Sequence, residues 1–185
     1  MAACALAATL VAVLAEPSAL TPAQIRLVEE AGNASVEVER YRHLRVLHER
    51  EDLDPALRPD LAIVLEAADL YANEREHWGS TVHPKVARRG FLRGYLREGW
   101  PAEVPESSPF FPIWCLYRGR ALIQQVIQSG NLAHDPEARE AYYGTGRQLL
   151  RIAREAYPHN RIARMYLGEN LPWPPLHPPD PRAPA

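Results

Sequence analysis

Three arginines near the end of the chain, Arg147, Arg151 and Arg154, recur at spacings of four and three residues. On an α-helix these spacings place the three side chains on one face. A guanidinium group presents a planar fork of donors that suits carboxylates, sulfates and phosphates. Arg161 and Arg164 repeat the pattern further along the chain. The spacing therefore predicts a helix face that binds an acidic polymer. The alternative is that this face is simply the solvated side of a surface helix.

A second candidate binding group is the segment from His77 to His83, which contains Trp78. An indole ring can stack on a sugar ring, and the imidazoles of the two histidines can form hydrogen bonds with its hydroxyl groups. Alternatively, Trp78 closes the end of a long helix by packing alone. We therefore group His77, Trp78 and His83 with Arg147, Arg151 and Arg154 as candidate substrate-binding residues.

No complete catalytic set can be read from the sequence, so we predict no catalytic residue. There is no His-Glu-x-x-His motif and no histidine pair at metal-binding spacing, and we therefore predict neither a metal nor another cofactor. The run Gly144-Thr145-Gly146 lacks the later glycine and the preceding strand of a dinucleotide site. Cys115 follows Ile113 and Trp114 in an apolar segment, which favours a buried, unreactive thiol.

The overall charge excludes one class of partner. The 185 residues include 21 Lys and Arg against 23 Asp and Glu, which gives a formal net charge of −2. Proteins that bind nucleic acid usually present a broad basic field, so we predict no nucleic-acid partner. Any binding of anions must depend on a local group of arginines. The length suits one domain with a substantial core.

The two ends of the chain differ in composition from the middle. Residues 2–15 are apolar apart from Thr9, a run too short to span a bilayer but of the length of a signal-peptide core. We therefore predict a signal peptide at 1–15, no stable membrane span, and a secreted or periplasmic protein. A cytoplasmic location is the alternative, because no Lys or Arg precedes the run. Residues 171–185 contain seven prolines and form a Pro-rich tail or linker.

Between these ends, residues 16–170 read as one all-α domain. Thr21-Pro22-Ala23-Gln24 is a capping box with proline at the first helical position, and Gly32 is expected to end that helix. Asp60 is expected to cap a long helix with one buried stripe, formed by Leu61, Val64, Leu65, Ala68, Tyr71 and Ala72. Asp135 and Asn160 are expected to start two later helices, with Gly168 ending the last one. Gly144-Thr145-Gly146 is expected to bend or break the first of these two. The expected helices cover 22–32, 35–51, a segment from 60, 84–99, 113–129, 136–157 and 160–168. We expect stacked antiparallel hairpins that form part of an α/α toroid, with a closed helical bundle as the alternative.

Two parts of the chain resemble a known family. The motifs are Tyr143-Gly-Thr-Gly-Arg-Gln-Leu-Leu150, Tyr157-Pro-His-Asn160 and the run from Met165 to Trp173. Together they look like the N-terminal helical region of heparinase II/III-like proteins. The segment from Glu76 to Lys85 and the following Arg-Gly-x-Leu-Arg-Gly-Tyr-Leu helix are similar to helices of that family's toroid.

This resemblance implies the N-terminal helical portion of a secreted lyase that acts on acidic polysaccharides. It also implies that the family's catalytic residues lie beyond Ala185, so that this chain alone is inactive. The partner is then an acidic polysaccharide, together with a missing C-terminal region or a second copy bound through exposed helical faces. The alternative is a stand-alone helical module that binds a glycan or a protein without catalysis.

Overall fold

The computed structural model describes residues 20–79, 99–128 and 135–169. Several predictions lie outside these ranges: the signal peptide at 1–15, His83, most of the helix expected at 84–99, and the Pro-rich tail at 171–185. Within α3 (Arg58–Gly79) the description of side chains ends at Ala72, so the side chains of His77 and Trp78 also lie outside it.

The described residues are helical and contain no strand, which confirms the all-α prediction. A short 3-10 turn, Pro55–Leu57, precedes α3. The other helices are α1 (Pro22–Asn33), α2 (Glu37–His48), α5 (Phe111–Gln128), α6 (Pro136–Ala156) and α7 (Arg161–Tyr166). Within the same ranges, no helix is both long and apolar enough to cross a membrane.

The capping residues behave as the sequence predicts at three helices. Thr21 accepts a hydrogen bond from the Gln24 backbone N–H, and the Gln24 side chain accepts one from the Thr21 backbone N–H at 2.8 Å, which completes the capping box of α1. Asp135 caps α6 and Asn160 caps α7. Gly168 follows α7 with a φ of 84°, the left-handed conformation that ends many helices.

Several predicted boundaries differ from the structure, such as those of α2, expected at 35–51 and found at Glu37–His48. Two of the differences concern a residue that was expected to start or end a helix. Gly32 does not end α1, which continues to Asn33; instead, the ring of Tyr157 lies where a Cβ of residue 32 would be. Asp60 does not cap α3, because the chain already turns at Pro55–Leu57 under an Asp54 cap and α3 starts at Arg58. The proline turn removes the need for a second cap, and Asp60 lies in the first turn of α3 instead.

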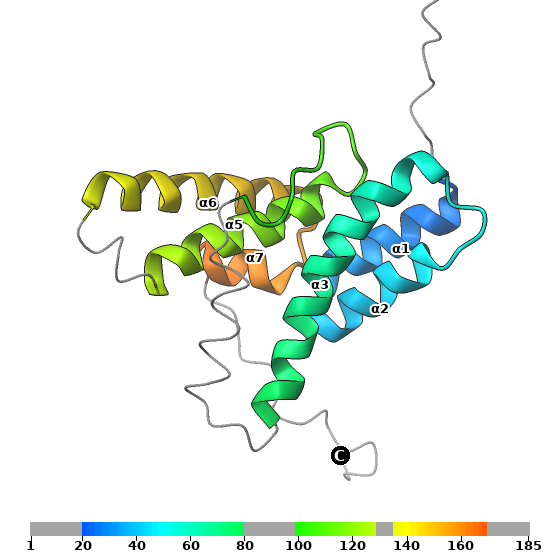
Figure 1. Cartoon of the computed structure of the whole chain (residues 1–185), viewed down its shortest axis with the longest axis horizontal. Helices are drawn as coiled ribbons and strands as arrows, with labels where there is room; N and C mark the ends of the chain where they lie inside the picture. Colours follow the sequence, from blue (N-terminus) through cyan, green and yellow to red (C-terminus); the bar gives the residue numbers. More distant parts are fainter. Residues whose placement is uncertain (1–19, 80–98, 129–134, 170–185) are drawn as a thin grey trace, which may run out of the picture.

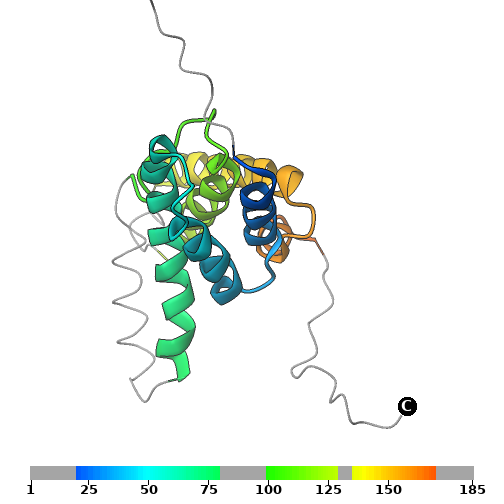
Figure 2. The ribbon, with the colours of Figure 1, turned by 90° about the vertical axis from the view of Figure 1, so that its right-hand side faces the viewer.

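The helices form two groups that share α5. Helices α1, α2 and α3 pack in chain order, and α5 and α6 lie side by side in opposite directions (Figure 1). Figure 2 views the molecule from the side on which α1 and α2 lie. One core cluster joins α1, α2 and α3 to α5, and the other joins α5 to α6 and α7. Because α5 contributes Ile113 and Tyr117 to the first cluster and Leu116 and Ile123 to the second, it holds the two groups together.

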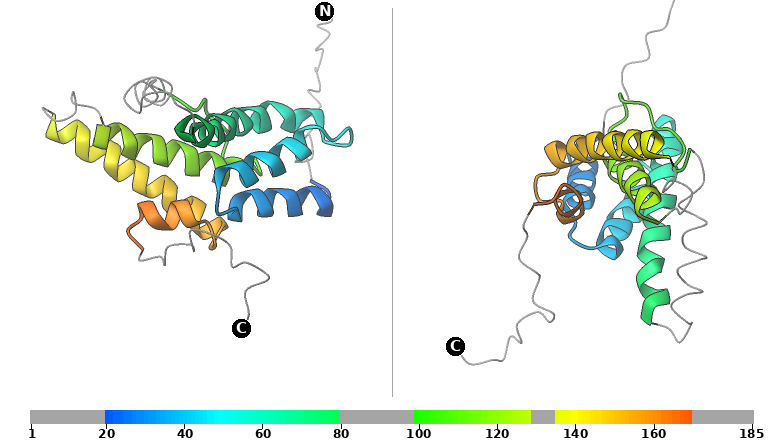
Figure 3. Two further views of the ribbon diagram at one scale, coloured as in Figure 1. Left: turned by 90° about the horizontal axis from the view of Figure 1, so that it is seen from below. Right: turned by 90° about the vertical axis from the view of Figure 1, so that its left-hand side faces the viewer.

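Helix α6 is unbroken from Pro136 to Ala156, so the break expected as one outcome at Gly144-Thr145-Gly146 is wrong. Helices α5 and α6 lie side by side (Figure 3), and Gly146 packs directly against Gly119 of α5. A Cβ added at Gly119 would lie 2.7 Å from the carbonyl oxygen of Gly146. The glycines therefore permit close contact between two straight helices.

Candidate functional site

The centre of the candidate site is Glu37, the first residue of α2. One carboxylate oxygen accepts hydrogen bonds from Arg40 Nη1 at 2.7 Å and from the hydroxyl of Tyr117 at 3.0 Å. The other accepts one from Arg120 Nη1 at 2.8 Å. Tyr117 and Arg120 both belong to α5, so this one carboxylate ties the start of α2 to the middle of α5.

Arg40 is fully buried and connects the carboxylate to the turn between α1 and α2. Its Nε donates to the carbonyl of Ala31 at 2.9 Å, and its Nη2 donates to the carbonyl of Ala34 at 2.7 Å. All three guanidinium nitrogens therefore have an acceptor. A buried ion pair is tolerated only when its remaining donors are satisfied in this way.

Arg120 continues the network toward α3 and α7. Its guanidinium lies 3.7 Å from the ring centroid of Tyr71, a close cation–π contact. The Tyr71 hydroxyl donates to Gln124 Oε1 at 3.1 Å, and Gln124 Nε2 donates to the Tyr166 hydroxyl at 2.9 Å. Hydrogen bonds and ring contacts thus run from α2 through α5 to α3 and α7.

The ionised forms of the network are stabilised by their partners. Burial alone would raise the pKa of Glu37, but the charges of Arg40 and Arg120 and the hydrogen bonds from Arg40 and Tyr117 lower it below its ordinary value. Burial alone would lower the pKa of Arg40, and Glu37 raises it. Burial, followed by the charge of Glu37, raises the pKa of Tyr117 well above its ordinary value, so its hydroxyl stays a donor.

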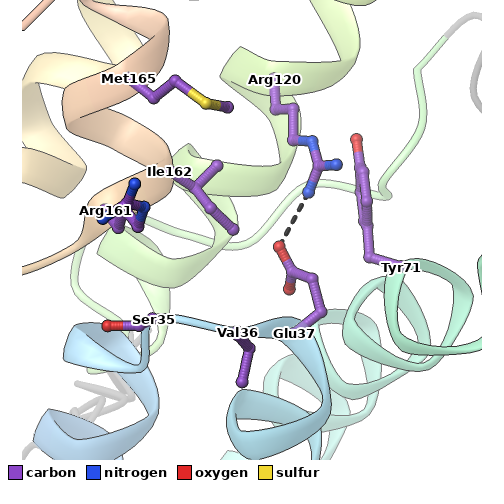
Figure 4. Close-up of a pocket in the computed structure, with 8 residues that line it drawn as sticks. All are labelled: Ser35, Val36, Glu37, Tyr71, Arg120, Arg161, Ile162 and Met165. Atoms are coloured by element: carbon purple, nitrogen blue, oxygen red, sulfur yellow. Dashed lines mark hydrogen bonds and ion pairs between the residues drawn. The ribbon is translucent and has the colours of Figure 1, made fainter. Parts of the chain in front are cut away.

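A pocket of about 240 Å³ opens beside this network (Figure 4). Figure 4 shows Ile162 and Met165 reaching from α7 toward the Glu37–Arg120 pair. The eight lining residues come from four helices and the α1–α2 turn: Ser35, Val36, Glu37, Tyr71, Arg120, Arg161, Ile162 and Met165.

Arg161 differs from the other charged residues of the pocket. Glu37 shares its one negative charge between Arg120, at 2.8 Å, and the buried Arg40, at 2.7 Å. Within the described ranges, no hydrogen bond or ion pair engages the half-buried guanidinium of Arg161. With two arginines and one glutamate in its lining, the pocket has a formal charge of +1 at neutral pH. This arrangement can attract and hold an anion.

The three arginines of the predicted face lie on α6, but two of them form hydrogen bonds with residues that follow α7. Arg154 Nε donates to Glu169 Oε1 at 3.1 Å, and Glu169 also binds Arg164 at 2.6 Å. Arg147 Nη2 approaches the carbonyl of Leu167 at 3.4 Å, next to the end of α7. Arg151 is exposed to solvent. The role of this face in binding a ligand stays a prediction.

Sequence reasoning missed Glu37, Arg40, Tyr117 and Arg120 for a physical reason. Glu37 and Arg40 are three residues apart on a helix, a spacing that usually marks an exposed surface pair. Only tertiary packing shows that both are buried and that the pair meets α5. Arg120 follows Arg118-Gly119 in the sequence, and nothing in that pattern identifies the carboxylate that it binds.

Two further kinds of reactive site, a thiol and a metal centre, can be checked in the part of the chain that the structure describes. Cys115 is fully buried, as predicted, and burial raises the pKa of its thiol to about 12. In those same ranges, no group of three or more His, Cys, Asp or Glu could hold a metal ion. Cys115 is not among the residues that line the pocket.

No protein-family model, curated protein or solved structure matches the chain. We therefore infer its function from the contacts and charges of the pocket.

Proposed function

We propose that this chain is a helical binding module whose pocket between α2, α3, α5 and α7 holds a ligand with a carboxylate group. The observation that carries the proposal is Arg161, a guanidinium at the pocket without an internal partner in the described ranges. Its neighbours Glu37 and Arg120 already bind each other. A carboxylate from a ligand would give Arg161 the counter-charge that it lacks among the described residues.

Partial enclosure makes such a contact useful. An ion pair between fully exposed groups contributes little, because water and salt screen it. Arg161 is half-buried and lies beside the apolar side chain of Ile162, which lowers the local dielectric constant. Arginine also binds a carboxylate through two parallel hydrogen bonds, which fixes the orientation of the ligand.

The proposal can be tested by nuclear magnetic resonance with acetate and its neutral analogue acetamide. We expect acetate to cause saturable shifts in the amide signals of Ile162 and Met165, and acetamide to cause much smaller ones. Arg161→Gln should abolish the difference between the two probes. Arg151→Gln removes an exposed arginine of α6 and serves as the matched control. Equal shifts from both probes, or acetate shifts that persist in Arg161→Gln, would refute the proposal.

A second candidate function follows from the arginines of α6 and α7. Arg151 is exposed, and the nearby Arg154 and Arg164 share a single carboxylate, Glu169. The excess of positive charge there supports binding of an acidic polysaccharide along this face. In this view the chain is the N-terminal helical portion of a heparinase II/III-like lyase, with its helices in a toroid. The secreted location and self-association through helical faces belong to the same proposal.

Heparin affinity distinguishes the two candidates. If the α6 face binds the polymer, the double variant Arg147→Ala plus Arg151→Ala should elute from a heparin column at lower salt than the unaltered chain. Arg161→Gln should then have the smaller effect. Unchanged retention of the double variant would exclude the polysaccharide face and leave the pocket proposal intact.

A further inference from the structure

The walls of the pocket are mainly aliphatic on the side of α7. Val36, Ile162 and Met165 line it together with the charged groups, and Met165 is 56% exposed. An exposed methionine is a flexible apolar group that adapts to the shape of a ligand. These side chains gain contact area only from a ligand that carries an apolar body next to its anionic group.

The one aromatic ring of the lining is not available for stacking. Tyr71 is 1% exposed, with the Arg120 guanidinium 3.7 Å from its ring centroid and the Tyr117 ring stacked at 5.2 Å. A sugar ring is polar around its rim and binds best when one face lies on an exposed aromatic ring. The pocket therefore lacks the platform that a uronic acid needs.

The volume limits the size of the ligand. A pocket of about 240 Å³ corresponds to about eight water molecules at ~30 Å³ each. A ligand that fills it has on the order of eight non-hydrogen atoms, which is the size of hexanoate. A disaccharide is too large to be enclosed by the pocket, and acetate leaves most of the apolar wall uncovered.

We infer that the pocket binds a small aliphatic monocarboxylate, with its carboxylate on Arg161 and its hydrocarbon body along Val36, Ile162 and Met165. This inference rests on the proposed function, because it requires that a carboxylate binds at Arg161. It adds the class of the ligand: a medium-length unbranched or lightly branched carboxylic acid. The bound anion neutralises the formal charge of the lining, and the hydrocarbon covers the exposed methionine.

The test is a calorimetric titration of the full chain with acetate, butyrate, hexanoate, hexanamide and glucuronate. A buried methylene group improves affinity by about fourfold. Because the pocket is partly open, we expect a gain of about two- to fourfold for each methylene up to hexanoate. Hexanamide and glucuronate should bind at least about tenfold more weakly than hexanoate, since one lacks the charge and the other the apolar body.

Two pairs of variants separate the contributions. Met165→Ala should weaken the binding of hexanoate but not of acetate, whereas Ile152→Ala, at an exposed apolar residue of α6, should change neither. Arg161→Gln should weaken every carboxylate, and Arg151→Gln none. If all carboxylates bind equally well and still depend on Arg161, the aliphatic class is wrong and the proposed function stands. If binding does not depend on Arg161, both fail.

Discussion

Gly119 of α5 and Gly146 of α6 face each other so closely that a Cβ on either would lie within 2.9 Å of the other's carbonyl oxygen. A backbone oxygen cannot move aside without displacing its helix. Gly119→Ala should therefore lower the free energy of unfolding by about 1–3 kcal/mol, the usual cost of overpacking. Urea denaturation monitored by circular dichroism measures this change.

Gly144 provides the matched control for that substitution. It lies in the same helix as Gly146, but a Cβ there would meet nothing within 4 Å. Gly144→Ala should raise the free energy of unfolding by up to about 1 kcal/mol, because alanine favours the helix over glycine. A similar loss of stability in both variants would show that helix contact is not what requires Gly119.

Glu37 holds the start of α2 against α5, and its charge is needed there. Glu37→Gln leaves the guanidinium of Arg40 fully buried without a counter-charge, since its other hydrogen bonds go to the neutral carbonyl groups of Ala31 and Ala34. Breaking one partner of a buried pair usually costs about 3–5 kcal/mol. We expect a loss of that order in urea denaturation. Glu39→Gln, at an exposed residue of the same helix, should change stability by less than about 0.5 kcal/mol.

The same carboxylate predicts how stability depends on pH. The pKa of Glu37 is lowered in the folded state, whereas in the unfolded chain it is about 4.3. Between these two values the unfolded state binds more protons, so stability rises with pH. The contribution of Glu37 is therefore complete above about pH 5 and is lost as the pH falls toward the lowered pKa.

Comparison with Glu37→Gln isolates this contribution from that of other carboxyl groups. The variant keeps every other acidic residue but lacks the one that titrates in the network. Its free energy of unfolding should fall less steeply with acid than that of the unaltered chain, so the two curves should converge below about pH 4. Parallel curves would mean that Glu37 has the same pKa in the folded and unfolded states.

The sequence predicted the helices well where local chemistry decides them. The predicted stripe of α3 is buried at five of its six positions, with Leu65 only partly buried; the stripe comprises Leu61, Val64, Leu65, Ala68, Tyr71 and Ala72. The capping residues Thr21, Asp135 and Asn160 each accept a hydrogen bond from the backbone N–H three positions later, so their patterns can be recognised in the sequence. Glycine was harder to interpret, because the same residue serves either a turn or a close contact between helices.

The candidate site could not be predicted from local sequence patterns. The bonds that define it join Glu37 to Tyr117 and Arg120, residues 80 and 83 positions away in the chain. No local periodicity encodes such a pairing. The arginines of α6 were prominent because their spacing is regular, whereas Arg161 is distinguished by its surroundings. Charge patterns in a sequence identify faces of helices, but the partners of a charge depend on the packing of those helices.

Asn160 joins the cap of α7 to the end of α1, and its two bonds can be removed separately. Its side-chain oxygen accepts from the Ala163 backbone N–H at 2.8 Å, and its Nδ2 donates to the carbonyl of Gly32 at 2.6 Å. Asn160→Asp keeps the cap but places a carboxylate against that carbonyl, so it should destabilise the chain. Asn160→Ala loses both bonds and should lower the free energy of unfolding by about 1–3 kcal/mol.

His159→Ala, at the exposed neighbouring residue, should leave stability nearly unchanged in the same thermal and urea unfolding experiments. If Asn160→Asp proves as stable as the unaltered chain, the bond to Gly32 contributes nothing, and the attachment of α7 to α1 must depend on other contacts, such as the hydrogen bond from the His159 backbone N–H to Asn33 Oδ1 at 3.1 Å.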